Sequence, residues 1–175
     1  MAEQEKKSGM REIFIEKMIL SCAGTADKLD KSVKLLKSLS GMKPLRTKSS
    51  KRIPNFSVRP GLETGCKVTI RGEKIIPLLK RLFEAVKNEI REKQIKENHF
   101  SFGVPEYIEI PDMEYDREIG ILGLNVTIDF ARKGKRVARK KIKPGKPGKK
   151  QIVSKEEIIE FVESLGVNIK RRRVE

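Results

Sequence analysis

Hydrophobic and polar residues alternate along several short stretches of the chain, and a spacing of two residues predicts β-strands. The first stretch, residues 11–21, changes phase near residues 16–17, which indicates a β-bulge. Residues 122–130 form the clearest late stretch, and residues 106–110 form a short one. Residues 66–71 alternate in the same way. One face carries the apolar side chains of Cys66, Val68 and Ile70, and the other carries two cations and a hydroxyl, those of Lys67, Arg71 and Thr69.

Three other stretches carry hydrophobic residues at intervals of three and four, which is the spacing of an amphipathic α-helix. The first, residues 27–40, ends before Gly41, and glycine is the residue type that most often caps a helix C-terminus. The second runs from about residue 73 to residue 95. Pro77 fixes its start, because proline is tolerated only in a first turn. The third opens at Ser154, where Ser-Lys-Glu-Glu forms a capping box.

The segments between these elements predict loops. Residues 98–103 predict a loop that carries Phe100 and Phe102, and residues 112–118 predict an acidic loop. Residues 132–150 contain eleven Lys or Arg, no acid and two Pro-Gly pairs. Such a segment cannot bury enough apolar surface to fold alone. We therefore expect it to be disordered in the free protein and ordered on a polyanion.

The length of 175 residues predicts one domain with tails. We expect a flexible N-terminal tail over residues 1–9, a single domain over residues 10–169 that includes the basic extension 132–150, and a basic C-terminal tail over residues 170–175. No apolar run approaches the roughly 20 residues that span a bilayer, and the N-terminus has no secretory h-region. Cys22 and Cys66 lie on apolar-patterned stretches and predict core thiols, so we expect a cytoplasmic protein.

Charge adds the main functional indication. The chain has 40 basic and 24 acidic residues, a formal net charge of +16, which favours binding to polyanions. Nucleic acid is the leading partner, and an anionic membrane surface is the second. Between Lys43 and Arg71 there are eight Lys or Arg and one acid, Glu63, in a stretch expected to supply two or three strands. This pattern suits a surface laid on phosphates, and the alternative is a basic sheet face that is only solvated.

Catalytic patterns are weak. The acidic loop could hold Mg²⁺, but its spacing fits no EF-hand, and His99 has no visible nucleophile beside it. The turn from Gly61 to Lys67 lacks the G-K-[ST] ending of a phosphate loop. Two Tyr and no Trp give little support to a base-stacking platform. We therefore expect no catalytic residue, no metal and no cofactor.

Several motifs in order resemble the universal large-subunit ribosomal protein five family, called large-subunit protein eleven in eukaryotes. They are SGMKP from Ser40, CKVTIRG from Cys66, FSFGV from Phe100, and EYD from Glu114 followed by GILG from Gly120. The resemblance runs from about Met10 to Val167. Arg11-Glu12-Ile13, Arg136-Val137-Ala138-Arg139 and the helix after Ser154 resemble the archaeal and eukaryotic branch.

The resemblance implies an α+β fold in which an antiparallel sheet has helices packed on one face and carries long basic loops. It implies a structural constituent of the large ribosomal subunit with no enzymatic activity. The implied partners are 5S rRNA in the central protuberance, large-subunit rRNA, P-site tRNA, a neighbouring 5S-binding ribosomal protein, and a small-subunit head protein across an intersubunit bridge. The implied location is the cytoplasmic ribosome, with nucleolar assembly if the source is eukaryotic.

The resemblance also implies site residues. Ser21 stands where Asn is common in the family, and Met42 stands where Gln is common. The implied 5S rRNA-binding residues are Ser21, Met42, Lys43, Lys67, Thr69 and Arg71. The implied tRNA-contacting loop is Arg59, Pro60, Gly61, Leu62, Glu63 and Thr64. Within the basic extension, the expected rRNA contacts are Arg132, Lys133, Arg136, Arg139, Lys140 and Lys141.

Two other hypotheses use the same charge differently. A non-specific nucleic-acid chaperone or duplex-binding protein would need the positive surface but no fixed site. An RNA-processing enzyme would use the acidic loop with Mg²⁺, and Asp116 would then be essential for turnover.

Overall fold

The computed structural model describes residues 9–170 and contains one six-stranded sheet in the order β2-β3-β1-β7-β6-β5. Every pairing in that sheet is antiparallel, and a separate two-stranded parallel sheet joins β4 to β8. The expected α+β class is confirmed. The strands are β1 Ile13–Ala23, β2 Leu45–Lys48, β3 Glu63–Ile70, β4 Glu89–Arg91, β5 Ile95–Lys96, β6 His99–Val104, β7 Leu124–Arg132 and β8 Asn168–Lys170. The α-helices are α1 Asp27–Ser40, α2 Ile75–Ala85, α3 Arg136–Arg139 and α4 Lys155–Ser164.

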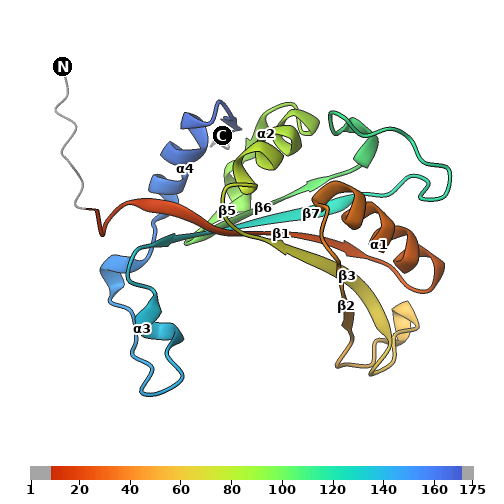
Figure 1. The fold of residues 1–175 in the computed structure, drawn as a ribbon, viewed down its shortest axis with the longest axis horizontal. Coiled ribbons are helices and arrows are strands. Elements are labelled where there is room, and N and C mark those ends of the chain that lie inside the picture. Colours follow the sequence, from red (N-terminus) through yellow and green to blue (C-terminus); the bar gives the residue numbers. More distant parts are fainter. Residues whose placement is uncertain (1–8, 171–175) are drawn as a thin grey trace, which may run out of the picture.

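Helices α1, α2 and α4 lie on the same side of the large sheet (Figure 1). The hydrophobic core fills the space between them and the sheet, and Leu20, Leu36, Leu82, Val126 and Ile158 are completely buried in it. The alternation in the sequence explains this arrangement, because it gives each central strand one apolar face for the helices to cover. The opposite face, which these three helices leave uncovered, is called the helix-free face below, and the candidate site lies there.

Several predicted elements are confirmed. The register between β1 and β7 shifts between Ile15 and Lys17, which is the expected bulge. Helix α1 has the predicted limits, and Gly41 caps it with φ of +65° and an N–H donated to the carbonyl of Lys37 at 2.9 Å. The capping box of α4 is formed, because Glu157 donates its N–H to Ser154 Oγ at 3.3 Å and accepts the Ser154 N–H at 3.1 Å.

The single long helix expected over residues 73–95 is wrong. Helix α2 ends at Ala85, because Lys87 and Asn88 adopt the left-handed conformation with φ of 56° and 55°. The chain then extends into β4 and β5, where Ile90 and Ile95 are buried as strand residues. Pro77 does lie in the first turn of α2, as predicted. Asparagine tolerates the left-handed region better than most residues, which is the local reason for the break.

Two short assignments are also wrong. The expected loop at residues 98–103 is strand β6, which pairs with β7 and turns Phe100 and Phe102 into the core. The expected strand at residues 106–110 is a 3-10 turn, Tyr107–Glu109, in which Tyr107 is completely buried. Phe100 has stacked ring contacts with Phe83, Phe102 and Phe130 at centroid distances of 6.2, 6.0 and 5.8 Å. Burial of these rings outweighs the weak local periodicity of the two segments.

Smaller differences concern the ends of elements. Strand β7 begins and ends two residues later than the expected 122–130. Strand β8 is an element that the sequence did not predict, and its last residue, Lys170, forms an ion pair with Glu89 at 2.5 Å. The predicted tails 1–9 and 170–175 lie, apart from Gly9 and Lys170, outside the described residues. Cys22 and Cys66 are buried free thiols in paired positions of β1 and β3, as expected of core residues.

Candidate nucleic-acid interface

The helix-free face of the sheet carries a continuous row of aligned residues. Paired residues of antiparallel strands point to the same face, so the register defines the row. Lys67 of β3 pairs with Leu45 of β2 and Ser21 of β1, Ser21 pairs with Asn125 of β7, and Asn125 pairs with Gly103 of β6. Five neighbouring strands therefore present one line of mainly polar groups with a lysine near one end.

A second row runs parallel to the first, two residues further along each strand. Thr69 pairs with Ile19, Ile19 pairs with Thr127, and Thr127 pairs with Ser101. Thr69 and Thr127 are half-buried among their strand neighbours, while Ser101 is exposed. The two rows together offer four hydroxyls, one amide and one cation on a pleated surface, and such groups bind phosphate and ribose oxygens.

The structure brings most of the expected 5S rRNA-binding residues to this region. Lys67, Thr69 and Ser21 lie in the two rows, and Arg71 follows the last residue of β3 with its side chain exposed. Lys43 is exposed two residues before β2, whose first residue pairs with Lys67. Met42 is different, because its side chain is half-buried and packs against the hydrophobic core. The positions of these residues do not test whether they contact RNA, so their assignment as 5S rRNA-binding residues stays a prediction.

Sequence reasoning missed the part of the face contributed by β6 and β7. Asn125, Thr127 and Ser101 belong to it because β7 pairs with β1 along almost its whole length. The alternation of β7 already placed Asn125 and Thr127 on its polar side, but the alternation does not say which strand is the neighbour. The acid of this region, Asp129, is neutralised by Lys17 at 2.9 Å.

The connection from β2 to β3 projects from one end of the sheet, on the side away from α1, α2 and α4 (Figure 1). Within the expected tRNA-contacting loop, Arg59, Pro60, Gly61 and Leu62 are exposed and lie before β3. Gly61 has φ of +83° and donates its N–H to the carbonyl of Ser49 at 2.8 Å, so this turn is held by backbone bonds. The projection and the last residue of β2 together expose four cations and one aromatic ring; they are Lys48, Lys51, Arg52, Arg59 and Phe56.

The last two residues of the expected tRNA-contacting loop, Glu63 and Thr64, belong to strand β3. Glu63 forms an ion pair with Arg46 at 3.1 Å, and Arg46 also contacts Asp30 at 2.7 Å. The hydrogen bond to Glu63, followed by the charge of Asp30, raises the pKa of Arg46. The acid nearest the projecting turn is therefore already neutralised within the protein.

The basic extension projects from the opposite end of the sheet, on the same side as the β2–β3 connection (Figure 1). It contains the one-turn helix α3 and a 3-10 turn at Lys149–Gln151. Arg136, Lys140 and Lys141 are exposed, and their contact with rRNA stays a prediction. The expectation that the extension orders only on a polyanion is not tested by this geometry and stays a prediction.

Arg132, the first of the expected contacts in the extension, is directed inward. Its side chain is only 12% exposed, and its Nη2 donates to both carboxylate oxygens of Glu157 at 2.6 Å. Burial opposes the ionisation of Glu157, but the hydrogen bonds from Ser154 and Arg132 outweigh it and lower the pKa of that carboxyl. Nη2 of Arg132 thus joins this end of β7 to α4, while Nη1 donates to the carbonyl of Lys150 at 3.1 Å.

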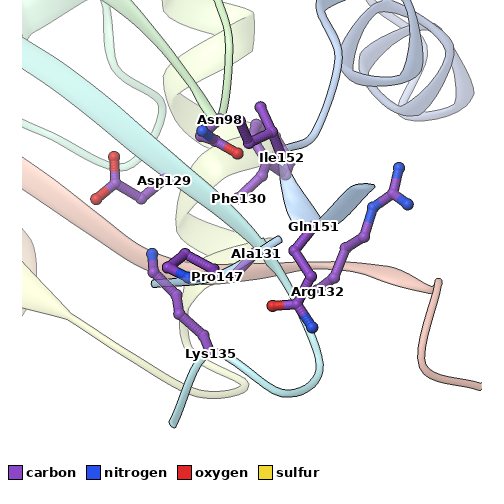
Figure 2. A pocket seen from close by; sticks show the side chains of 9 residues that line it. All are labelled: Asn98, Asp129, Phe130, Ala131, Arg132, Lys135, Pro147, Gln151 and Ile152. Carbon is purple, nitrogen blue, oxygen red and sulfur yellow. The ribbon is translucent and has the colours of Figure 1, made fainter. Parts of the chain in front are cut away.

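A hollow of about 160 Å³ lies where the extension meets the sheet, between Asn98, Phe130, Lys135, Pro147 and Gln151 (Figure 2). Its walls mix apolar surface with a few polar groups. Asn98 Oδ1 accepts the N–H of Val153 at 2.8 Å, so it holds the two sides together. In Figure 2, the guanidinium of Arg132 points away from the hollow. The hollow therefore lies at the contact between the extension and the sheet, and Lys135 is one of the residues that line it.

The acidic loop is held by the protein's own side chains. Tyr107 Oη accepts the N–H of Asp116 at 2.9 Å, and Glu118 pairs with Lys34 at 2.5 Å. Arg81 donates to the carbonyl of Pro111 at 2.7 Å. Among residues 9–170, no group of three or more potential metal-ligating side chains is found. Within the same part of the chain, no helix has the length and apolar character required to cross a bilayer.

A polar, helix-free sheet face between two basic projections suits binding to a polyanion such as RNA. Comparison with known proteins identifies the family. The model of the C-terminal region of the ribosomal L5 protein family matches residues 63–165.

The similarity to whole proteins covers nearly all of the chain. The chain is 45% identical over 164 residues to large ribosomal subunit protein uL5 of Nanoarchaeum equitans, covering 91% of this chain and 97% of that protein. It is 37% identical over 171 residues to the uL5 protein of Archaeoglobus fulgidus, covering 94% and 96%. It is 39% identical over 166 residues to that of Sulfurisphaera tokodaii, covering 93% and 94%.

The chain belongs to the uL5 family of large ribosomal subunit proteins. It is a ribosome-associated structural protein with rRNA as its class of partner, and the family is not one of enzymes. The hypothesis of an RNA-processing enzyme built on the acidic loop is therefore set aside.

Proposed function

We propose that this protein binds 5S rRNA in the central protuberance of the large subunit through the helix-free face of its sheet. The observation that carries the proposal is the alignment of Ser21, Lys67 and Asn125 in one row with Thr69 in the next. These positions join residues from three strands into one surface that α1, α2 and α4 leave open. A folded RNA can meet such a surface through its sugar-phosphate backbone, where Lys and Arg neutralise phosphates and hydroxyls position the strand.

The two projections extend the proposal to further partners. The turn of Arg59 to Leu62 would reach P-site tRNA, and the basic extension would contact large-subunit rRNA. Contacts with a neighbouring 5S-binding protein, and with a small-subunit head protein across an intersubunit bridge, complete the proposed role. The proposed location is the cytoplasmic ribosome. The archaeal relatives give no support to nucleolar assembly.

The sharpest test removes one hydroxyl from the face. Thr69→Val keeps the shape of the side chain but leaves an RNA polar group without its partner, which costs about 1–3 kcal/mol of binding free energy. Thr64→Val is the matched control, because Thr64 lies in the same strand five residues earlier, at the register shift between β2 and β3 and outside the two rows. Affinity for a 5S rRNA transcript, measured by equilibrium filter binding, should fall for the first variant and not for the second.

The competing function is non-specific duplex binding. The two functions are distinguished by repeating the affinity measurement with a random RNA duplex over a range of salt concentrations. Both RNAs should bind more weakly as salt rises, but a specific site should retain a preference of roughly 10³-fold for 5S rRNA. Equal affinity for the two RNAs would establish the non-specific alternative, and unchanged affinity of Thr69→Val would remove Thr69 from the site.

A further inference from the structure

A buried carboxylate, that of Glu16, lies at the bulge of β1. None of the functions proposed above assigns it a role. Glu16 is the extra residue between Ile15 and Lys17, the two residues on either side of the register shift, and its side chain is only 7% exposed. A bulge redirects the side chain of its extra residue away from the regular alternation. Burying an ionised carboxylate is costly unless cations and hydrogen bonds compensate it.

The compensation for Glu16 comes from the basic extension, more than a hundred residues later. Lys135 Nζ donates to Glu16 Oε2 at 2.5 Å, and the guanidinium of Arg139 pairs with Oε1. Lys135 and Arg139 are four residues apart at the two ends of the turn that forms α3, so they lie on the same face of it. One carboxylate thus holds one face of the helical turn against the sheet.

The other cations of this segment face outward. Arg136, Lys140 and Lys141 are exposed, and within residues 9–170 none of the three forms an ion pair. A second acid, Glu12, pairs with Lys133 at 3.0 Å, but both of those side chains are 57% exposed. The extension therefore pairs with one buried carboxylate in β1, that of Glu16, and with one exposed carboxylate just before β1, that of Glu12.

We propose that Glu16 is a positioning residue for RNA binding: it docks Lys135 and Arg139 so that the outward cations of the extension are presented in a fixed arrangement. The proposal rests on the proposed function, because it assigns a role to the extension in contacting rRNA. Its physical content is pre-organisation, since a segment that is already ordered loses less conformational entropy when it binds. It therefore replaces the expectation that the extension is disordered in the free protein.

The proposal predicts that Glu16→Gln changes the affinity for RNA in the direction opposite to the one expected from net charge alone. Removing an acid makes a basic protein more positive, and simple electrostatics then strengthens binding to RNA. If Glu16 positions the extension, Glu16→Gln must weaken binding to RNA although the net charge rises. Glu12→Gln makes the same change in charge at an exposed pair, so it should leave the affinity unchanged or raise it.

The first experiment concerns the full-length protein without RNA. Hydrogen exchange is followed at the amides of Ala138 and Gly145, which donate to the carbonyls of Lys135 and Val137 at 3.1 Å each. Both amides should be protected in the unsubstituted protein, and Glu16→Gln should speed their exchange about tenfold or more, while Glu12→Gln should not. Equal exchange in the unsubstituted protein and Glu16→Gln would overturn the proposal, and it would do so whether or not the protein binds RNA.

The second experiment measures affinity for a 5S rRNA transcript and for large-subunit rRNA. Glu16→Gln should bind the RNA that the extension contacts about threefold to tenfold more weakly, measured at a temperature at which the variant is folded. In a Lys135→Gln/Arg139→Gln background, the same substitution should no longer lower the affinity, because it has no partners to release. A loss of similar size in both backgrounds, or no loss for either RNA in the first, would show that Glu16 does not position the extension. Absence of binding by the unsubstituted protein would instead contradict the proposed function.

Discussion

Glu157→Gln tests how much the junction between the basic extension and α4 contributes to stability. Glutamine keeps the size of the side chain and can still accept the Ser154 N–H, so the capping box survives. What is lost is the negative charge that receives two hydrogen bonds of 2.6 Å from Arg132. The substitution therefore isolates the ion pair from the cap.

The magnitude follows from the burial of the two partners. Exposed ion pairs contribute about 0–1 kcal/mol, whereas breaking a fully buried pair costs about 3–5 kcal/mol. The side chains of Arg132 and Glu157 are 12% and 27% exposed, which places this pair between the two limits. We expect the free energy of unfolding to fall by about 2 kcal/mol at neutral pH, and Tm to fall by about 4–8 °C.

The dependence on pH gives the decisive assay. Folding lowers the pKa of Glu157 from its ordinary value of 4.5, so the carboxylate contributes its stabilisation fully above that pH. The contribution is lost as pH falls through the lowered, folded-state pKa. Urea unfolding of both proteins should therefore show a difference at pH 7 that shrinks steadily below pH 4.5. Glu156→Gln, in the same first turn of α4, is the control and should cost less than about 1 kcal/mol. A difference that stays constant into acid would refute the electrostatic explanation and assign the loss to packing.

Two further predictions concern the projecting turn and the aromatic core. Replacing Pro60–Leu62 by a short glycine link should spare affinity for 5S rRNA but weaken protection of the tRNA elbow in chemical footprinting of assembled subunits; loss of 5S rRNA affinity would show that the turn is misassigned. Phe100→Ala should lower the free energy of unfolding, measured by urea titration, by about 3–5 kcal/mol, because the ring is completely buried against three other rings. A loss below about 1 kcal/mol would contradict that packing.

The elements that sequence reasoning predicts well are those whose pattern is local and long. Helix α1 has a full apolar stripe and a glycine cap, and β1 and β7 alternate over many residues, so the core-facing side of each follows from the sequence. Strand β6 also alternates, with Phe100 and Phe102 inward, but its six residues between turn-forming neighbours are too few to be distinguished from a loop. The break after α2 depends on two left-handed residues, Lys87 and Asn88, and only asparagine hints at it.

The candidate site is predictable only strand by strand. The polar sides of β3 and β7 follow from their alternation, but their alignment across β1 depends on pairings between distant parts of the chain. Glu16 illustrates the limit, since its partner Lys135 is 119 residues away and neither residue type signals the other. The family resemblance names Thr69 and Arg71, but it does not reveal which neighbouring groups complete the surface.

The central position of β1 has a consequence for how the chain reaches this structure. Residues 13–21 must pair with residues 125–132, so the middle of the sheet closes only after about three quarters of the chain has been synthesised. Until then β1 can pair with β3 but exposes its other edge, and unpaired edges of this kind invite association between chains. A nascent molecule would thus meet its greatest aggregation hazard before β7 emerges from the translating ribosome. Slow elongation between β3 and β7 should lengthen that interval, and truncation before residue 124 should leave an insoluble product.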